Sequence, residues 1–358
     1  MPDRTLIIAE AGVNHNGSLD LALQLVDVAV EAGADIVKFQ TFKSEQLVTA
    51  GAARATYQVV NTEDDGSQLA MLRRLQLSPE DHVALAEHCE TRGIRFMSTA
   101  FDAESLAFLS GFEMPAIKIP SGDLTFGPML LQAARMRVPL IISTGMSTLG
   151  DVEQALGVVA FGLTSLAQPG GRADFETAFQ TAEGQAALKR LVTLLHCTTE
   201  YPAPLDSVNL RAMDTLRSAF GLAVGYSDHT MGISVPIAAA ARGASVIEKH
   251  FTLDRAMPGP DHAASLEPRE LSAMVDAIRA VEHALGSRIK GPDSRELGNR
   301  AVARRSLVAA RPIAAGEILT EAMLGAKRPG HGVSPMQTWD LLGMAATRDY
   351  ATDDLIET

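Results

Sequence analysis

The amino-acid sequence predicts an α/β protein, a (β/α)₈ barrel of the TIM type followed by a small second domain. Short apolar runs alternate eight times with amphipathic segments, over about 280 residues, as a barrel requires. No G-x-G-x-x-G pattern follows the first run, which disfavours a doubly wound sheet. After Gly286 the composition changes, and the remaining chain is too short to hold a large core of its own.

Each predicted strand is a short apolar run that ends in polar residues. The predicted strands are 6–10, 35–40, 94–99, 116–120, 140–144, 193–197, 223–227 and 246–250. The predicted helices are 18–32, 79–92, 103–111, 127–137, 148–160, 207–219, 232–242 and 268–285. Strands joined by helical crossovers are parallel, so all eight carboxyl ends are expected at one end of the barrel.

Two segments interrupt this alternation. Residues 42–78 are polar and helix-poor, and they are long for a loop after a strand, which predicts a lid or substrate loop. Residues 163–190 add a Pro-Gly-Gly turn and further polar sequence, which predicts a surface insertion without chemistry. Residues 286–303 are rich in glycine and basic residues and are expected to be a linker between a barrel of residues 1–285 and a domain of residues 304–358.

Composition limits the classes of function. The chain has 358 residues, of which 46% are hydrophobic and 21% charged, as in a soluble globular enzyme. A net charge of −12 argues against a nucleic-acid surface, and no apolar run approaches the ~20 residues of a membrane span. Cys89 and Cys197 are too few for a disulfide framework and fit a reducing compartment. We therefore expect a cytoplasmic protein without nucleic-acid or membrane partners.

Four charged residues lie inside otherwise apolar predicted strands: Glu10, Lys38, Lys118 and Glu248. Polar residues could simply mark where strands give way to loops, and that explanation accounts for the serines and threonines. It does not account for these four, because an unpaired buried charge is costly. Active sites of barrel enzymes lie at the carboxyl ends of the strands. The four residues therefore predict a polar site there.

His229 and His250 end the last two predicted strands, on either side of an alanine-rich helical segment. Neighbouring parallel strands would bring both imidazoles to the same end, close enough to share one ion. Glu248 shares a strand face with His250. His196 is either a core histidine bonded to backbone or a catalytic residue. A pair with Cys197 is disfavoured because neighbours in a strand point to opposite faces.

The chain resembles the sialic acid synthase family, the bacterial nonulosonate synthases that include N-acetylneuraminate and legionaminate synthases. The matching segments span nearly the whole chain in the family's order; they are IIAEAGVNHNGSL, ADIVKFQTFKSEQLV, KIPSGD, PLIISTGM, LLHCTTEYPAP, VGYSDHTMGI, VIEKHFTLD, PGPDH and KRPGHGVSP. The resemblance implies a (β/α)₈ barrel followed by an antifreeze-like (SAF) domain. This agrees with the two-part organisation predicted from the pattern.

The resemblance also implies a reaction. Members condense phosphoenolpyruvate with an N-acylated mannosamine-type sugar and release phosphate. His229 and His250 are implied to hold a divalent ion, typically Mn²⁺, with Mg²⁺ and Co²⁺ as alternatives; imidazole suits such ions. The rival readings are an octulosonate or heptulosonate synthase, which would not explain the C-terminal domain, and a non-catalytic sugar-binding protein, which has no use for so many buried charges.

The family's functional positions imply roles for individual residues. Glu10 and Glu248 are implied to transfer protons, and Lys38 and Lys118 to work with them as catalytic residues. The residues implied to hold phosphoenolpyruvate are Lys38, Lys118, Thr99, Ser121, Ser143 and Ser227. Those implied to face the sugar are Gln40, Asp123, Thr199, Tyr201, Asp261 and Arg328. The family's matching arginine crosses to a partner subunit, so the resemblance implies a domain-swapped homodimer.

Three positions depart from the family pattern. Asp123 stands where many members carry glutamate, Thr199 where some carry asparagine, and His331 where asparagine or threonine is common. All three lie on the sugar side and leave the identity of the sugar open. We expect unphosphorylated N-acetylmannosamine, which gives N-acetylneuraminate. The alternative is 2,4-diacetamido-2,4,6-trideoxymannose, which gives N,N′-diacetyllegionaminate.

Overall fold

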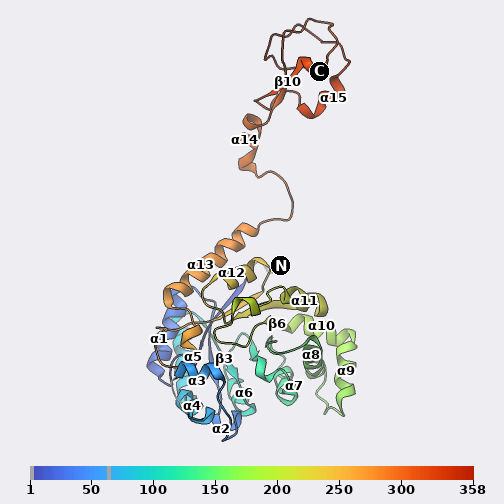
Figure 1. The fold of residues 1–358 in the computed structure, drawn as a ribbon. Helices are drawn as coiled ribbons and strands as arrows, with labels where there is room; N and C mark the ends of the chain where they lie inside the picture. Colours follow the sequence, from blue (N-terminus) through green and yellow to red (C-terminus); the bar gives the residue numbers. More distant parts are fainter. Residues whose placement is uncertain (1–3, 63–65) are drawn as a thin grey trace. The chain divides into compact units, whose positions relative to one another are not determined.

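A computed structural model describes residues 4–62 and 66–358 of the chain. The chain forms two compact units, Met1–Gly286 and Ser287–Thr358. In the described part of the first unit, eight parallel strands pair in chain order and close into a barrel (Figure 1). The predicted barrel is confirmed. Its strands are β1 (Leu6–Gly12), β2 (Ile36–Thr41), β3 (Arg95–Ala100), β4 (Ile117–Ile119), β5 (Leu140–Ser143), β6 (Val192–His196), β7 (Ala223–Asp228) and β8 (Val246–His250).

Helices cover the outside of the barrel, with one main helix after each strand. These are α1 (Leu19–Glu31), α5 (Pro79–Arg92), α6 (Ala103–Leu109), α7 (Gly127–Arg135), α8 (Leu149–Thr164), α11 (Ala212–Phe220), α12 (Ser234–Ala241) and α13 (Pro268–Leu285). Local sequence sets where they begin. Ser78 and Asp81 form a capping box at the start of α5, and Thr148 and Asp151 form another at the start of α8.

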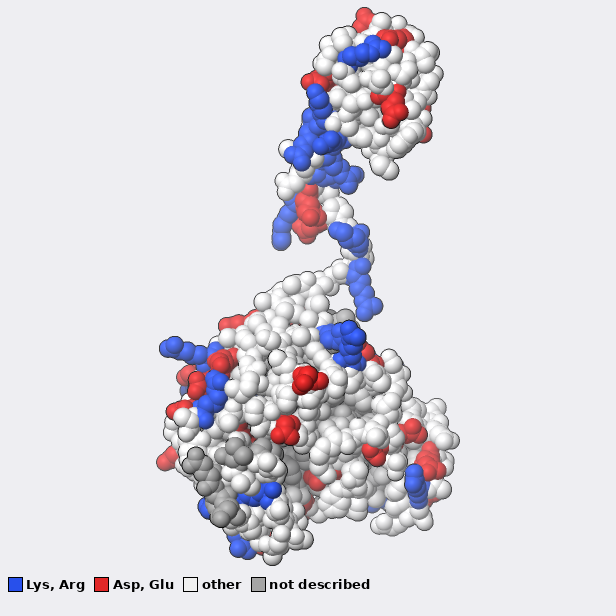
Figure 2. All heavy atoms as spheres, in the orientation of Figure 1, with Lys and Arg blue, Asp and Glu red and all other residues white. Residues whose placement is uncertain are grey.

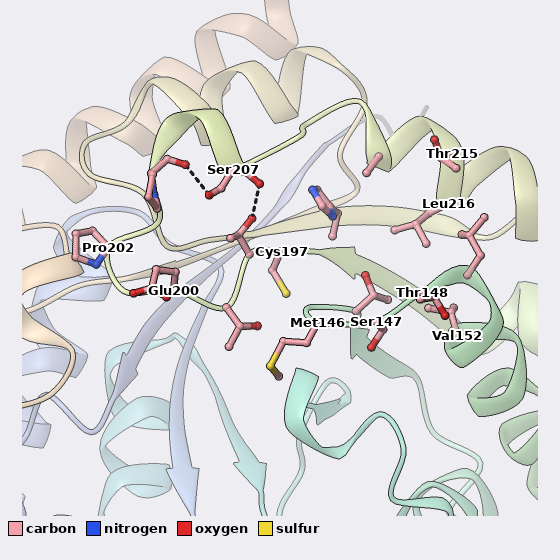
Figure 3. Close-up of a pocket in the computed structure, with 17 residues that line it drawn as sticks. Met146, Ser147, Thr148, Val152, Cys197, Glu200, Pro202, Ser207, Thr215 and Leu216 are labelled. Atoms are coloured by element: carbon pink, nitrogen blue, oxygen red, sulfur yellow. Dashed lines mark hydrogen bonds between the residues drawn. The ribbon is translucent and has the colours of Figure 1, made fainter. Parts of the chain in front are cut away.

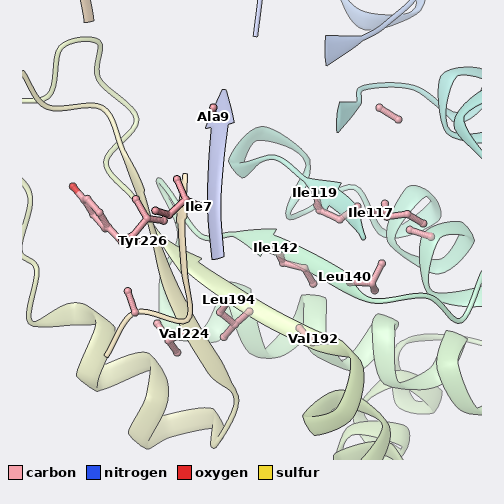
Figure 4. Packing of buried hydrophobic residues seen from close by; sticks show 14 of the residues in the cluster. Ile7, Ala9, Ile117, Ile119, Leu140, Ile142, Val192, Leu194, Val224 and Tyr226 are labelled. Carbon is pink, nitrogen blue, oxygen red and sulfur yellow. The ribbon is translucent and has the colours of Figure 1, made fainter. Parts of the chain in front are cut away.

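Alternate residues of each strand point to opposite faces and build two apolar layers. Figure 4 shows outward residues such as Ile7, Ile142, Leu194 and Tyr226, which pack between the strands and the helices. A smaller cluster fills the barrel interior below the site; its buried members are Ile8, Ile36, Met97, Ala116, Ile141, Leu195 and Val246. The interior is therefore a packed core that supports the polar carboxyl end.

The sequence predicted that residues 42–78 are helix-poor, and this prediction is wrong. They contain α2 (Ser44–Leu47), α3 (Thr56–Thr62) and α4 (Gln68–Leu75). Met71, Leu72 and Leu75 of α4 pack with Val13 and Phe42 in a buried apolar cluster. These helices are short, and short helices depend on tertiary packing for their stability. The segment is consequently a wall of helices rather than an open loop.

Residues 163–190 also contain helices. After α8 come α9 (Arg172–Gln180) and α10 (Ala182–Leu191), and both pack against α8. Phe161 and Phe175 meet edge to face with ring centroids 5.5 Å apart. A Cβ at Gly157 would lie 3.0 Å from the carbonyl oxygen of Phe175, so a glycine at this position lets α9 approach closely. The insertion is thus a helical layer on the barrel surface.

The first helix of the second unit is α14 (Ser294–Ala303), which lies within the segment expected to be a linker. An Asp293–Glu296 capping box starts this helix, and all its residues are exposed. Figure 2 shows lysine and arginine side chains gathered along this segment. The rest of the unit pairs β9 (Ser306–Ala309) with β10 (Leu324–Lys327) antiparallel, adds α15 (Thr338–Leu341), and encloses a small core around Leu307, Leu319 and Tyr350. No helix in the described ranges is long and apolar enough to cross a membrane.

Candidate active site

The carboxyl end of the barrel opens into a pocket of about 380 Å³. Each of the eight strands, or the residue just after it, contributes at least one buried inward side chain to this pocket. In strand order these residues are Glu10, Lys38, Thr99, Lys118, Ser143, Cys197, Ser227 and Glu248. All eight are buried. The structure therefore brings the four charged residues singled out by the sequence into one site.

The four charges form a paired network. Lys38 Nζ lies 2.7 Å from Glu10 Oε2 and 3.5 Å from Glu248 Oε2, and Lys118 Nζ lies 3.5 Å from Glu248 Oε1. Hydroxyls complete the shell. Lys38 donates to Thr99 and Lys118 donates to Ser143, each at 2.8 Å. Pairing makes burial of these charges tolerable. It also places two ammonium groups and two hydroxyls where a small anion can bind.

The pKa values of the two carboxyl groups are shifted in opposite directions. Burial raises the pKa of Glu10 above its usual range, and Lys38 only partly offsets this effect. Burial acts in the same sense on Glu248, but Lys118 and Lys38 outweigh it and lower the pKa of Glu248 below its usual range. Ser227 Oγ also donates to Glu248 at 2.9 Å. One carboxyl group suited to carry a proton beside one that stays ionised is a general acid–base arrangement.

His229 and His250 lie side by side at the same end of the barrel, with ring centroids 5.7 Å apart. Burial lowers the pKa of His229 to about 4 and that of His250 well below its usual value, so both imidazoles are neutral. His229 Nδ1 is 2.6 Å from the carbonyl oxygen of Thr198, which fixes the ring. The Tyr201 ring packs against the His229 ring, with the two centroids 4.1 Å apart.

This pair suits a divalent ion in its chemistry. His250 Nδ1 is buried without a hydrogen-bond partner and lies 4.0 Å from Asp261 Oδ2. With His229 Nδ1 engaged by backbone, its Nε2 is the nitrogen left for a ligand. Across residues 4–62 and 66–358, no group of three or more His, Cys, Asp or Glu side chains has metal-holding geometry. Two neutral imidazoles fit an ion that takes its other ligands from water and substrate oxygens.

The remaining predicted residues of the first unit line the same pocket; they are Gln40, Ser121, Asp123, Thr199, Tyr201 and Asp261. Gln40 Nε2 donates to Glu10 Oε1 at 3.4 Å, and Ser121 Oγ accepts from the backbone N–H of Gly145 at 3.0 Å. Burial raises the pKa of Asp123 to about 6. Arg328 belongs to the second unit, where it is exposed.

Sequence reasoning missed two parts of the pocket. Cys197 points inward, with its Sγ 3.1 Å from Ser121 Oγ. Segment 42–78, together with Val13 and Phe101, supplies an apolar wall; its residues are Val13, Phe42, Leu47, Val48, Met71, Leu72, Leu75 and Phe101. The spacing of Met71, Leu72 and Leu75 along one helical face was the available signal for the wall.

A second cavity of about 850 Å³ lies beside the pocket, between the start of α8 and α11 (Figure 3). It shares Met146, Cys197 and Thr199 with the pocket. Its lining is largely hydroxyl and apolar groups, so it lacks the paired charges of the smaller pocket. His196 lines it and lies with Nε2 2.7 Å from the carbonyl oxygen of Val208. Of the two roles open for His196, this contact supports the structural one.

Comparisons with known proteins agree with this geometry. The NeuB family model matches residues 25–290, and the SAF domain model matches residues 304–358. The chain is 46% identical to the N,N′-diacetyllegionaminic acid synthase of Campylobacter jejuni, over 99% of both chains. It is 45% identical to the Legionella pneumophila synthase of the same name, over 94% of this chain and 89% of the relative.

A solved structure shows the same likeness. The N-acetylneuraminic acid synthetase of Leptospira borgpetersenii, in complex with citrate, superposes with a TM-score of 0.66 at 30% identity, over 83% of this chain and 90% of the other. The family match covers most of the barrel that carries the charged pocket, and the Campylobacter jejuni relative aligns over 99% of both chains. The chain therefore belongs to the NeuB family of nonulosonate synthases, with a SAF domain at its C-terminus.

Proposed function

We propose that this enzyme condenses phosphoenolpyruvate with 2,4-diacetamido-2,4,6-trideoxymannose to give N,N′-diacetyllegionaminate and phosphate. Identities of 46% and 45% to two named legionaminic acid synthases support this sugar. N-acetylmannosamine, which the sequence alone favoured, becomes the second candidate. It is supported by the 30% identity to a named N-acetylneuraminic acid synthetase.

The apolar wall of the pocket is the observation that carries the choice of sugar. Phe42, Met71 and Leu72 are buried and line one side of the pocket. A 6-deoxy sugar with two acetamido groups presents three methyl groups, and burial of each methyl is worth about 0.8 kcal/mol. N-acetylmannosamine has a hydroxyl at carbon 6 instead. Against this wall that hydroxyl would lack a partner, which costs about 1–3 kcal/mol.

The charged residues support binding of phosphoenolpyruvate. Its phosphate and carboxylate carry the charge that two buried ammonium groups attract, and charge-assisted hydrogen bonds to Lys38 and Lys118 are strong. Thr99 and Ser143 already accept hydrogen bonds from these lysines and hold them in place. The lysines are therefore the anchor for the anion, and Ser121 and Ser227 line the same pocket.

The carboxyl groups support the proton transfers. Carbon 3 of phosphoenolpyruvate forms a bond to the aldehyde carbon of the open-chain sugar, water adds at carbon 2, and the C–O bond to phosphate breaks. Glu10, with its raised pKa, donates a proton to the former aldehyde oxygen. Glu248 stays ionised and accepts a proton from the attacking water. The second proton of the water leaves the carbon-2 hydroxyl as the carbonyl forms and goes to the departing phosphate, so both protons of the water are accounted for.

His229 and His250 are proposed to hold a divalent ion of the Mn²⁺ type, with Mg²⁺ and Co²⁺ as alternatives. When bound, such an ion supplies Lewis-acid polarisation of the aldehyde oxygen. The Thr198 carbonyl orients His229, and the Tyr201 ring contacts both imidazoles. Asp261, near His250, is proposed to contact the sugar.

A symmetric homodimer is also proposed, in which Arg328 of one chain serves the sugar pocket of its partner. The support is the exposure of Arg328 within the KRPGHG segment and the family's matching arginine. A cytoplasmic location is proposed from Cys89 and Cys197, which are both buried free thiols.

One assay tests the reaction and the sugar together. The purified protein is incubated with phosphoenolpyruvate, Mn²⁺ and each sugar in turn, and phosphate release and product mass are measured. We expect kcat/KM for the trideoxy sugar to exceed that for N-acetylmannosamine by at least about tenfold. A higher kcat/KM for N-acetylmannosamine would identify N-acetylneuraminate as the product. Absence of phosphate release with either sugar would reject the proposed reaction.

A further inference from the structure

A buried ion pair joins the residues that immediately precede the two histidines. Asp228 ends β7 and Lys249 is the last residue but one of β8, and the two are register partners across the parallel strands. Asp228 Oδ2 lies 2.6 Å from Lys249 Nζ, and both side chains are 0% exposed. Because strand neighbours alternate, this pair faces away from the pocket while His229 and His250 face into it.

The same ammonium group also holds the residue after His229. Lys249 Nζ donates to the carbonyl oxygen of Thr230. Thr230 is tied back to Asp228, since its backbone N–H donates to Oδ1 and its hydroxyl donates to Oδ2, both at 3.1 Å. His229 is therefore bracketed by two residues that bind one lysine, and that lysine precedes His250.

These contacts act on the backbone that carries the two imidazoles. A slip of one residue between β7 and β8 would turn every side chain to the opposite face. The ion pair opposes such a slip, because Lys249 reaches Asp228 and Thr230 only in the observed register. The bonds of Thr230 also limit how far the loop after β7 can move. The rings of His229 and His250, with centroids 5.7 Å apart, are carried by the backbone that these contacts restrain.

We propose that Asp228, Lys249 and Thr230 form a clamp, a set of positioning residues that fixes the separation of His229 and His250 for a shared divalent ion. The inference rests on the metal site of the proposed function. The clamp residues touch neither the substrates nor the ion. They act through the backbone, as the outer contacts of metal-ligating histidines do.

A purely stabilising role is the alternative, and it makes a different prediction. A buried ion pair is often no more stabilising than neutral groups of similar shape, whereas removal of one partner leaves a costly unpaired charge. The informative variant is therefore the double substitution Asp228→Asn/Lys249→Met. It leaves no unpaired charge, and the asparagine can keep both bonds to Thr230. Only the link across to β8 is lost.

The test measures Mn²⁺ binding to the full-length, metal-free protein by calorimetry, together with urea unfolding without metal. For the double variant we expect Kd for Mn²⁺ to rise at least about tenfold, with unfolding close to wild type. Thr230→Val removes one hydrogen bond and no charge, and should raise Kd about threefold. Arg279→Met is the matched control, because it breaks a partly buried pair with Asp35 (2.8 Å) at the amino ends of the strands. It should lower stability and leave Kd unchanged.

The outcomes separate the clamp from the function on which it rests. If the wild type binds Mn²⁺ and both clamp variants bind it equally tightly, the clamp is wrong and the metal site stands. If the double variant does not fold, the Kd of Thr230→Val decides, and an unchanged value overturns the clamp. If the wild type binds none of Mn²⁺, Mg²⁺ and Co²⁺, the metal site and the clamp both fall, whatever the rate of phosphate release.

Discussion

Lys38 Nζ lies 2.7 Å from Glu10 Oε2, and each of these side chains is only 3% exposed. The two residues face each other across the parallel strands β1 and β2. In this pair a carboxyl group with a raised pKa lies next to an ammonium group that the proposed reaction assigns to phosphoenolpyruvate. An anion that binds Lys38 therefore competes with Glu10, and substrate binding is coupled to the proton that Glu10 carries.

The first prediction concerns the lysines. Lys38→Met and Lys118→Met should each lower kcat/KM for phosphoenolpyruvate about a hundredfold, because a buried charge-assisted contact is worth a few kcal/mol. Initial rates at varied phosphoenolpyruvate measure this effect. Lys43→Met is the control, since Lys43 is exposed and paired with the exposed Glu104. Unchanged saturation by phosphoenolpyruvate in both site variants would reassign the two lysines to structural ion pairs.

The second prediction concerns the histidines. His229→Ala and His250→Ala should each abolish metal-dependent turnover while the barrel stays folded, because each removes one of two protein ligands. Activity is measured after chelation and return of Mn²⁺, with circular dichroism as the check on folding. His196→Gln is the matched control, since His196 lies in the neighbouring cavity and contacts the Val208 carbonyl. Near-normal turnover by either site variant would place the ion elsewhere.

The barrel and its network of four buried charges could be predicted from the sequence for a physical reason. Charges such as Glu10 and Lys118 are tolerated in apolar strands only where they find partners, and barrel topology collects the strand ends in one place. The alternation of strand faces also correctly separated His196 from Cys197. That Cys197 lines the pocket was missed because a thiol at a strand end carries no distinctive pattern.

The helical wall was harder to predict. In α2, α3 and α4 the helical period is too short to stand out, and packing of Met71 and Leu72 against Phe42 supplies the stability. The exposed helix α14 did carry a signal, the Asp293–Glu296 capping box, within composition typical of a linker. The capping box was visible in the sequence, but the glycine-rich and basic composition around it favoured a linker over a helix.

The third prediction tests the apolar wall. Met71→Gln keeps the length of the side chain and adds a polar group, so it should lower kcat/KM for the trideoxy sugar about tenfold. The loss with N-acetylmannosamine should be smaller, because its carbon-6 hydroxyl can bond the new amide. The ratio of the two specificity constants is the measurement. Leu166→Gln, at a position 69% exposed on the surface, is the control. An unchanged ratio for Met71→Gln would mean that the apolar wall does not select the sugar.

The fourth prediction concerns stability in acid. Burial lowers the pKa of His15 to about 4. Between pH 6.5 and 4 the unfolded chain therefore binds more protons than the folded one, so stability falls as pH falls. The loss from His15 alone should approach about 3 kcal/mol at pH 4. His15→Asn should flatten the curve of stability against pH, because asparagine does not titrate. Its Oδ1 can still accept from the Gly17 N–H, as His15 Nδ1 does at 3.0 Å. Urea unfolding at several pH values measures this, with exposed His331→Asn as the control. Identical slopes for His15→Asn and wild type would contradict it.

The last prediction concerns Arg328 and the proposed homodimer. Arg328→Ala should weaken use of the sugar without loss of Mn²⁺ binding, since Arg328 is exposed and belongs to the unit that lacks the proposed metal ligands. If Arg328 serves the partner's pocket, an inactive His250→Ala chain mixed with the impaired Arg328→Ala chain should give mixed dimers that are more active than either homodimer. In the mixed dimer, one barrel then keeps both His250 and an intact partner arginine. Each mixed dimer has one competent site out of two, so isolated mixed dimers should show roughly half of wild-type activity. The two chains carry different affinity tags so that mixed dimers are isolated before assay. No recovery in isolated mixed dimers would mean that Arg328 serves its own barrel or neither.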